Sequence, residues 1–242
     1  GSDVKDFRPG DEVYGDLSGA GFGAFAEYAS VPVKYLAKKP GNISYEEAAA
    51  IPLAGVTALQ AVRDTGRVKA GQKVLVNGAT GGVGMFALQI ARSLGAEVTG
   101  VGSTNKLAML RSIGVHQVID YIKEDYTAMG PRYDLIIDAA AFRSVAACKR
   151  ALKPGGRYVL IGGSTSRLMK TMFLSPIMSG KKKVATMMAR PNPEDLAYLK
   201  KLVESEQVNP YIDKRFPLID TANAIRYVED RKVKGKVVIT MG

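Results

Sequence analysis

One stretch decides the fold of this chain, Val76-Asn77-Gly78-Ala79-Thr80-Gly81-Gly82-Val83-Gly84. The apolar run Lys73–Asn77 at its start is too short for a helix and predicts a buried strand. After the glycines, apolar residues recur at helical spacing and form one stripe: Val83, Phe86, Ala87, Ile90, Ala91 and Leu94. We therefore expect a helix that ends at Gly95, and a second strand at Glu97–Val101 completes a βαβ unit. In that context the glycines predict a dinucleotide-binding loop. An ordinary turn is the alternative.

The chemistry of a pyrophosphate explains why small residues stand in this turn. Gly81 allows the phosphates to approach the backbone, and Gly84 allows the helix to pack closely on the strand. The free N–H groups of the first helical turn then bind the anion. The expected contacts are Ala79, Thr80, Gly81, Gly82, Val83 and Gly84. Ala79 replaces the first glycine of the usual motif, so that position must adopt a less demanding conformation.

The end of the second strand indicates which dinucleotide binds. NAD-binding loops place an acidic residue there to accept hydrogen bonds from the ribose hydroxyls. This chain instead has Val101-Gly102-Ser103-Thr104-Asn105-Lys106, which contains no acid. Because a hydroxyl and an ammonium group bind a 2′-phosphate that a carboxylate would repel, the sequence predicts NADPH as the cofactor. The alternative for Ser103 is that it only caps the following helix.

Strand and helix patterns alternate from about Ser44 onward, which predicts an α/β protein with a Rossmann-type, doubly wound parallel sheet. Six strands are expected: Lys73–Asn77, Glu97–Val101, Gln117–Ile119, Tyr133–Asp138, Arg157–Ile161 and Lys183–Met188. Helices are expected from Ser44, where Glu47 completes a capping box, from about Thr57 to Gly66, from Asn192 to Ser205 and from Thr221 to Asp230. Further strands are expected at Glu12–Tyr14, Ala24–Val33 and Lys236–Thr240.

Composition excludes several classes of protein. The 242 residues are 46% hydrophobic and 24% charged, as in ordinary folded proteins. One Cys, Cys148, and one His, His116, cannot form a disulfide or a multi-histidine or thiolate-rich metal site. No stretch approaches the roughly 18 apolar residues of a membrane span, and no leader is visible, so we expect a cytoplasmic protein.

The formal net charge of +11 favours anionic partners. The one dense basic run, Lys181–Lys183, is short and has no aromatic residues within it. A solvated loop therefore explains the run better than nucleic-acid binding does, and no nucleic-acid partner is expected.

Several motifs together resemble the zinc-free quinone oxidoreductase and enone reductase branch of the medium-chain dehydrogenase/reductase superfamily. Besides the glycine turn, they are Pro52-Leu53-Ala54-Gly55-Val56-Thr57-Ala58, Leu152-Lys153-Pro154-Gly155-Gly156-Arg157 and Gly235-Lys236-Val237-Val238. The resemblance covers nearly the whole chain and implies that part of a GroES-like, β-rich catalytic domain accompanies the Rossmann domain, with NADPH in the cleft between them. The implied boundaries are 1–45 for the partial catalytic domain, 46–190 for the Rossmann domain and 191–242 for the return to the catalytic domain.

The resemblance also implies roles for particular residues. Gly55 and Thr57 would lie beside the nicotinamide, and Gly162 and Lys236 would border the cofactor further along. Ser103, Lys106 and Tyr121 would surround the 2′-phosphate. The family's chain begins before the equivalent of Asp3, so this chain resembles a fragment, and the absence of an initiator Met agrees with a longer parent. The family commonly pairs its last Rossmann strand across a two-fold axis, which implies a homodimer.

Without a metal to polarise a carbonyl, the expected substrates are electron-poor acceptors, namely quinones and α,β-unsaturated carbonyl compounds. NADPH would supply the hydride, and the protein would orient it. No general acid is obvious: Tyr14 and Tyr28 are candidates, although a packing role is the commoner one for a strand tyrosine. Tyr35-Leu36-Ala37-Lys38-Lys39 fits the Tyr-x-x-x-Lys pattern of short-chain reductases, but it precedes the glycine turn instead of following it. A non-catalytic NADPH-binding or membrane-surface-associated protein remains the alternative function.

Overall fold

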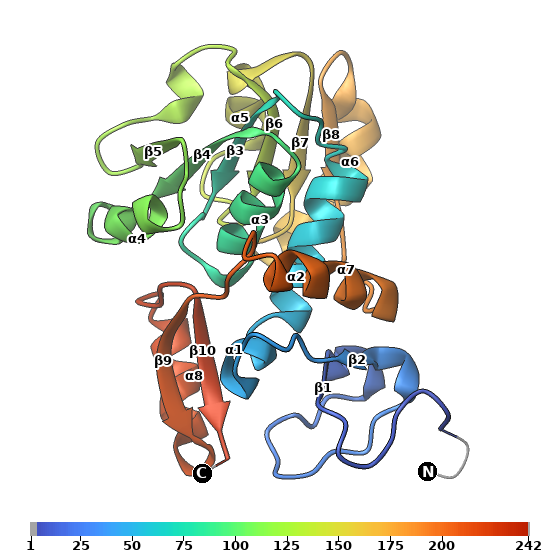
Figure 1. Ribbon diagram of the computed structural model, residues 1–242. Coiled ribbons are helices and arrows are strands. Elements are labelled where there is room, and N and C mark those ends of the chain that lie inside the picture. The colour runs from blue at the N-terminus through green and yellow to red at the C-terminus, as the bar shows by residue number, and fades with distance from the viewer. Residues whose placement is uncertain (1–3, 242) are drawn as a thin grey trace. The chain divides into compact units, whose positions relative to one another are not determined.

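The computed structural model describes residues 4–241, which form two compact units (Figure 1). Unit 1 consists of two segments, the residues up to Val56 and those from Ala189 onward. Unit 2 consists of Thr57–Met188. The sequence predicts boundaries at 45/46 and 190/191, and the assignment of these parts as a catalytic and a Rossmann domain stays a prediction. Each unit is described by itself below.

Unit 2 is built on a six-stranded sheet in which every neighbouring pair is parallel. The strand order is β5-β4-β3-β6-β7-β8. The strands are β3 Lys73–Asn77, β4 Glu97–Gly102, β5 Gln117–Asp120, β6 Tyr133–Asp138, β7 Leu152–Leu160 and β8 Lys183–Thr186. The order reverses at β3, as in doubly wound sheets that bind dinucleotides. This confirms the predicted fold class.

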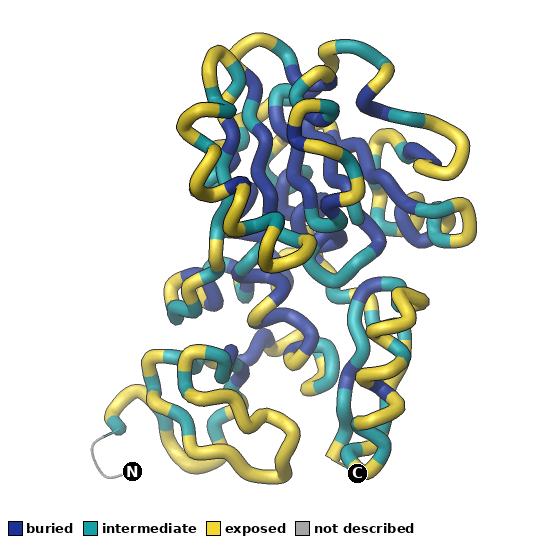
Figure 2. Tube along the Cα trace, turned by 180° about the vertical axis from the view of Figure 1, so that it is seen from behind, coloured by how far each residue is buried: buried dark blue, intermediate teal, exposed yellow. Residues whose placement is uncertain are grey.

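The helices of unit 2 connect these strands and leave the sheet as a buried layer, visible as the dark central strands of Figure 2. They are α3 Gly82–Ser93, α4 Leu107–Ser112, α5 Val145–Ala151 and α6 Thr165–Ser179, with short 3-10 turns η4 Thr104–Lys106 and η5 Tyr126–Ala128. The predicted stripe of α3 is confirmed, since Phe86, Ala87 and Ile90 are fully buried. Each large apolar side chain buried in this way contributes about 1.5–3 kcal/mol.

Helix α2, Pro52–Leu59, leads into unit 2 and continues as a wide π-helical turn, η3, over Gln60–Thr65. The Gly66 N–H donates to the carbonyl of Ala61 at 2.8 Å, which closes that turn. The sequence predicts a start near Thr57, and that start is wrong because Pro52, which has no N–H to leave unpaired, begins the helix instead.

Unit 1 combines two small sheets with helices from both ends of the chain. Strands β1 Val13–Gly15 and β2 Leu36–Lys38 are antiparallel, and β9 Ile212–Pro217 and β10 Lys236–Thr240 are parallel. The remaining elements are α1 Tyr45–Ala49, α7 Pro193–Glu204, α8 Thr221–Glu229 and the 3-10 turns η1 Leu17–Ala20, η2 Val33–Tyr35 and η6 Leu218–Asp220. The Tyr14 hydroxyl donates to the carbonyl of Leu196 at 2.7 Å and so ties β1 to α7.

Predicted helix caps are present in unit 1. Ser44 and Glu47 form a reciprocal capping box at α1. Asn192 caps α7 by accepting from the Asp195 N–H at 2.7 Å, and Pro193 follows at the first helical position.

Two predicted strands are corrected by the structure. Ala24–Val33 is not a strand: residues 24–30 are exposed and pair with no strand in the described part of the chain. The last predicted Rossmann strand stops at Thr186 rather than Met188, because β7 offers no residue beyond Leu160 for it to pair with.

Candidate dinucleotide-binding site

The glycine turn joins the carboxyl end of β3 to α3 and places its tightest bend at Gly78. That residue has a φ of +77°, in the left-handed region that favours glycine. Ala79 follows with an ordinary φ, is fully buried, and its N–H donates to the carbonyl of Val101 at 3.1 Å. The motif therefore tolerates alanine at its first position because the demanding conformation lies one residue earlier.

Gly84 and Gly81 meet different requirements in this turn. A Cβ on Gly84 would lie 2.2 Å from the carbonyl oxygen of Gly78, so only glycine allows α3 to approach the turn this closely. A Cβ on Gly81 would meet only that oxygen, at 3.5 Å, an ordinary contact. Gly81 is also the N-cap residue of α3, and no side chain caps the helix. The first-turn N–H groups of Gly82 and Val83 are thus left without a side-chain acceptor, as an anion site requires.

A buried carboxylate holds the strand ends around this turn. Asp138, the last residue of β6, is completely buried and accepts hydrogen bonds from Asn77 Nδ2 at 2.8 Å and from the Tyr158 hydroxyl at 2.7 Å. It also accepts the N–H of Ala141 at 2.7 Å. Because β3, β6 and β7 are fixed together in this way, the loop after β6 lies against Gly78. The sequence reasoning missed Asn77 and Asp138. Their signal was a polar residue at the end of a buried strand.

Ser103 and Lys106 follow β4 at the same edge of the sheet. The Ser103 hydroxyl donates to Asn105 Oδ1 at 2.7 Å and makes no capping bond, although Ser103 occupies the N-cap position of η4. Lys106 is partly buried and ends η4. The simple capping explanation for the Ser103 side chain therefore does not hold. Contact of either residue with a phosphate stays a prediction.

The neighbouring strand supplies a carboxylate that the sequence reasoning overlooked. Asp120 ends β5, pairs in register with Gly102, and accepts hydrogen bonds from the Thr104 hydroxyl at 2.5 Å and the Ile122 N–H at 3.1 Å. The Thr104 hydrogen bond, more than any other group, holds the pKa of Asp120 below its ordinary value. The segment 101–106 contains no acid, but strand pairing brings one beside it.

Tyr121 lies next to a cavity of about 190 Å³. Its N–H donates to the Gly102 carbonyl at 3.1 Å, and its ring faces that of Phe142 with centroids 6.1 Å apart. The cavity is lined by Asn77, Tyr121, Tyr126, Phe142 and Arg143. The structure therefore places Tyr121 in an aromatic pair at the carboxyl edge of the sheet, near the ends of β3, β5 and β6. Phe142 and Arg143 were not among the expected residues.

Other expected residues have packing reasons of their own. A Cβ on Gly162 would lie 2.0 Å from the Ala139 carbonyl oxygen, so glycine is required where β7 leaves the sheet beside β6. In unit 1, a Cβ on Gly55 would lie 3.0 Å from Leu199 Cδ1, which explains glycine where α2 meets α7. Thr57 is a partly buried residue of α2, at the start of unit 2. Their roles toward a cofactor stay predictions.

Lys236 begins β10 in unit 1. Burial lowers the pKa of its ammonium group, and the charge of Asp16 opposes that shift. Asp16 caps η1 by accepting the Ser18 N–H at 2.9 Å, while its other carboxylate oxygen is buried without a hydrogen bond among the described residues. A partly buried cation and a half-satisfied carboxylate thus share this unit, and the sequence indicated only the lysine.

The two tyrosines considered as proton donors differ. Tyr14 is buried and its hydroxyl is bonded to Leu196, so burial raises the pKa of Tyr14 and its role is packing. Tyr28 is 90% exposed. Neither is shown as a donor, and the catalytic acid stays unassigned.

The residues present do not fit a zinc site. Cys148 is buried in α5 and lies 3.3 Å from the Tyr126 hydroxyl, while His116 Nδ1 accepts the N–H of Val98 at 3.2 Å at the start of β4. In the described range 4–241, no three His, Cys, Asp or Glu side chains are grouped to hold a metal ion. Independence from zinc stays a prediction.

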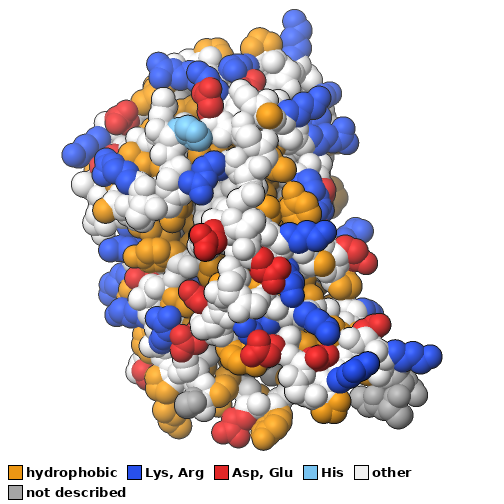
Figure 3. Space-filling model, in the orientation of Figure 1, with side chains coloured by type: hydrophobic (Ala, Val, Ile, Leu, Met, Phe, Trp, Pro, Cys, Tyr) orange, Lys and Arg blue, Asp and Glu red, His pale blue; other side chains and the backbone are white. Residues whose placement is uncertain are grey.

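Basic side chains are spread over the visible face and are interleaved with acidic ones (Figure 3). Within residues 4–241, no helix is both long enough and apolar enough to cross a bilayer.

Comparison with known proteins agrees with this geometry. The model of a family described as zinc-binding dehydrogenase matches residues 113–239. The chain is 32% identical to the chloroplast envelope quinone oxidoreductase homolog of Arabidopsis thaliana, over 99% of this chain and 75% of that protein. The chain belongs to the medium-chain dehydrogenase/reductase superfamily. Within this superfamily it is also 34% identical to the NADPH-dependent alkenal/one oxidoreductase, chloroplastic, of Arabidopsis thaliana.

That second superfamily member is matched over 99% of this chain, which spans only 60% of its length. Among solved structures, the quinone oxidoreductase from Coxiella burnetii superposes with a TM-score of 0.89 at 30% identity, over 100% of this chain and 75% of that one.

Proposed function

We propose that this protein is an NADPH-dependent reductase of quinones or α,β-unsaturated carbonyl compounds that uses no metal. The observation that carries the proposal is the uncapped first turn of α3 beside Gly81, at the edge of the sheet where the strand order reverses. The names of the relatives from Arabidopsis thaliana and Coxiella burnetii support the substrate class.

The residues of unit 2 fit a dinucleotide. The N–H groups of Gly82 and Val83 would bind the pyrophosphate, since no side chain competes for them. Tyr121 and Phe142 form a tilted aromatic pair that lines the cavity of about 190 Å³, an environment that suits an adenine ring. Ser103 and Lys106 would bind the 2′-phosphate through charge-assisted hydrogen bonds.

When bound, NADPH supplies the hydride, and the protein has to bind and orient it. Gly55 and Thr57 are proposed to lie at its nicotinamide end, with Gly162 and Lys236 along its length. Lys236 is partly buried, and this burial lowers the pKa of its ammonium group. The proton donor of the reaction is left open.

The test is steady-state oxidation of NADPH, followed by absorbance, over a panel of quinones and enones with saturated ketones as controls. We expect turnover with the electron-poor acceptors and none with the saturated ketones. Saturable binding of NADPH without turnover over the whole panel would overturn the proposal and favour a non-catalytic NADPH-binding protein.

We also propose that the protein is a homodimer. Strand β8 pairs only with β7 in the described chain and leaves its outer edge open. Helix α6, which precedes it, exposes Phe173 and Ile177, 70% and 83% exposed, together with Met169 and Met172. An open edge beside an apolar helix is the type of surface that a second copy covers. A cytoplasmic location stays an expectation, and two of the relatives are named as chloroplast proteins.

A further inference from the structure

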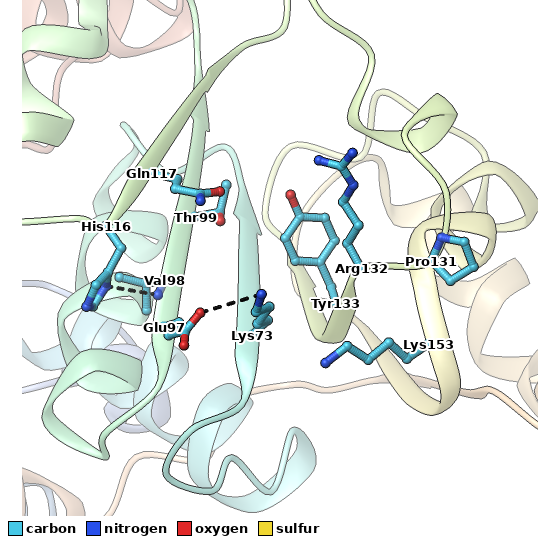
Figure 4. A pocket seen from close by; sticks show the side chains of 10 residues that line it. All are labelled: Lys73, Glu97, Val98, Thr99, His116, Gln117, Pro131, Arg132, Tyr133 and Lys153. Atoms are coloured by element: carbon cyan, nitrogen blue, oxygen red, sulfur yellow. Dashed lines mark hydrogen bonds and ion pairs between the residues drawn. The ribbon is translucent and has the colours of Figure 1, made fainter.

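A second cavity in unit 2 lies at the edge of the sheet opposite the glycine turn (Figure 4). Its volume is about 370 Å³. Four of its lining residues are the first residues of strands that neighbour one another in the sheet: Lys73 of β3, Glu97 of β4, Gln117 of β5 and Tyr133 of β6. Because the strands are parallel, these residues mark the amino edge, whereas the glycine turn leaves the carboxyl end of β3. The two sites are separated by the length of the strands.

The cavity exists because one face of the sheet changes from apolar to polar along its strands. Leu75, Val101 and Ile119 belong to the buried cluster on that face. Side chains alternate with a period of two along a strand, so Lys73, Thr99 and Gln117, each two residues earlier, lie on the same face. The connection between β5 and β6 contains only the three-residue turn η5. The amino half of this face is therefore left open and polar.

Two hydroxyl groups form the inner wall of the cavity. Thr99 and Tyr133 are only 5% and 4% exposed, and their hydroxyls lie side by side as hydrogen-bonding partners (Figure 4). Burial raises the pKa of Tyr133, while the Thr99 hydroxyl and the charge of Arg132 oppose that shift. The phenol is thus a neutral donor at physiological pH. His116 Nδ1 accepts the Val98 N–H at 3.2 Å, so the neutral ring carries its proton on Nε2 and is a further donor.

The charged groups of the cavity have unequal partners. Lys73 Nζ lies 3.8 Å from Glu97 Oε2, and Lys153 Nζ lies 2.8 Å from Asp134 Oδ2. Arg132 Nε donates to the carbonyl of Met129 at 3.0 Å, and among the described residues no carboxylate pairs with this guanidinium. Among the lining residues, three cations accompany one carboxylate, Glu97. Asp134, which pairs with Lys153, and Glu124, whose charge acts on Tyr133, lie outside the lining. The lining itself therefore has a positive excess, and Arg132 is its cation without a carboxylate partner among the described residues.

The polar and charged groups that line the cavity indicate which kind of ligand it can bind. The lining is mostly polar, which does not suit a quinone or another apolar molecule. The positive excess disfavours a cation, and an exposed guanidinium binds phosphate or carboxylate through two parallel hydrogen bonds. Buried hydroxyls and an amide bind alcohol groups. The volume lies within the range of sites for small molecules.

We propose that this cavity binds a small hydroxylated organic anion, of which a sugar phosphate is the best-fitting case. Its anionic group lies at the guanidinium of Arg132, while Lys73 and Lys153 line the other end of the cavity (Figure 4). Its hydroxyl groups lie at Thr99, Tyr133 and Gln117. The proposal is independent of the cofactor site, because all these residues lie at the amino edge.

The test is calorimetric titration of the unliganded protein with four probes at one salt concentration: glucose 6-phosphate, gluconate, inorganic phosphate and glucose. We expect the sugar phosphate to bind with 1:1 stoichiometry, gluconate to bind more weakly, and inorganic phosphate to bind at least about tenfold more weakly than the sugar phosphate, because it cannot reach the hydroxyls. Glucose should not bind measurably. Inorganic phosphate binding as tightly as the sugar phosphate would overturn the assignment of a hydroxylated ligand.

Variants locate the binding. Arg132→Gln should weaken sugar-phosphate binding by about tenfold to a hundredfold, since it removes a charge-assisted hydrogen bond. Arg132 is exposed, so the fold should survive, and circular dichroism checks this. Arg111→Gln, an exposed arginine of α4 outside the cavity, is the matched control and should leave binding unchanged. Thr99→Val should weaken the sugar phosphate but not inorganic phosphate. Binding that Arg132→Gln leaves unchanged lies elsewhere, at α3 for example, and would overturn the proposal.

Discussion

In the proposed cofactor site, Ser103 and Asp120 would make opposite contributions to the choice between NADPH and NADH. The hydroxyl favours a 2′-phosphate, whereas the carboxylate at the end of β5 is ionised and would repel one. Both Asp120 oxygens accept hydrogen bonds, from Thr104 and from Ile122, which reduces their exposure to a ligand. The proposed preference for NADPH would therefore depend on the cation at Lys106, which is the residue to change.

Replacing Lys106 by Ala should weaken NADPH binding by roughly ten- to a hundredfold and leave NADH binding nearly unchanged. The physical reason is that the lost charge-assisted hydrogen bond involves a phosphate that only NADPH carries. Calorimetry with both cofactors at one salt concentration measures the effect, and Lys69→Ala, an exposed lysine just before β3, is the control. Equal affinity of the unmodified protein for the two cofactors would contradict the prediction.

The single cysteine should be unreactive in the folded protein. Burial raises the pKa of Cys148 to about 11, so at pH 8 about one thiol in a thousand is ionised. Alkylation by iodoacetamide at pH 8 should be undetectable in the folded state and complete in urea. The pKa of Cys148 is raised from 9.0, so burial of the neutral thiol contributes to the stability of the folded state below pH 9. This contribution is lost as the pH rises toward 11. Fast alkylation of the folded protein at pH 8 would show that the α5 environment opens.

Among the elements, substitutions at two glycines of the α3 turn should have different effects, one on stability and the other on cofactor binding. Gly84→Ala should lower the thermal midpoint strongly or prevent folding, because the new Cβ would lie 2.2 Å from a carbonyl oxygen that cannot move independently. Gly81→Ala should leave the midpoint within a few degrees, since its Cβ makes only a 3.5 Å contact, but should weaken NADPH binding. Thermal melts and calorimetry on both variants test this. Equal midpoints would mean that α3 shifts freely.

The elements that could be predicted from the sequence are those with a clear local pattern of apolar residues. Helix α3 and strands β3 to β6 combine a clear apolar period with glycine at their ends, so local pattern and tertiary packing agree. Helix α6 was missed because it contains Pro176, buries only Thr171 among its residues and turns its apolar side chains outward. The strand expected at Ala24–Val33 has suitable residue types, but a strand needs a partner, which composition does not reveal.

The residues of the candidate site also fall into a group that the sequence predicts and a group that only the fold reveals. The positions in the turn from Gly78 to Gly84 are contiguous, so spacing alone identified them. Asp138 lies beside the turn and Asp120 beside the end of β4, and both positions follow only from the registers β3·β6 and β4·β5. A search for acids along residues 101–106 could not find a carboxylate that strand pairing brings in.

At the scale of the whole molecule, the exposed face of α6 tests the homodimer. Ile177→Glu should shift the protein from dimer to monomer in light scattering at micromolar concentration, because it places a charge on the apolar face beside the open edge of β8. Ile219→Glu, at a residue 95% exposed outside this face, is the matched control and should leave the dimer intact. A monomer before any substitution would contradict the dimer.

Removal of metal should have no effect. Dialysis against a chelator is expected to leave the thermal midpoint and NADPH binding unchanged, because His116 and Cys148 lie in separate, already bonded environments. Elemental analysis before and after dialysis is the measurement. Stoichiometric zinc that is lost together with stability would overturn the prediction.

The division of unit 1 into two chain segments determines the order in which a ribosome can complete the molecule. Unit 2 is continuous in sequence and can fold once Met188 has emerged. Residues up to Val56 emerge before unit 2, yet two of their partners emerge after it: Tyr14 waits for Leu196, and Asn42 waits for Val203. During synthesis the early segment can pair β1 with β2, but its contacts with α7 must wait until the sheet of unit 2 has emerged. A chaperone that binds nascent chains would therefore be expected to bind this segment for longer than it binds unit 2.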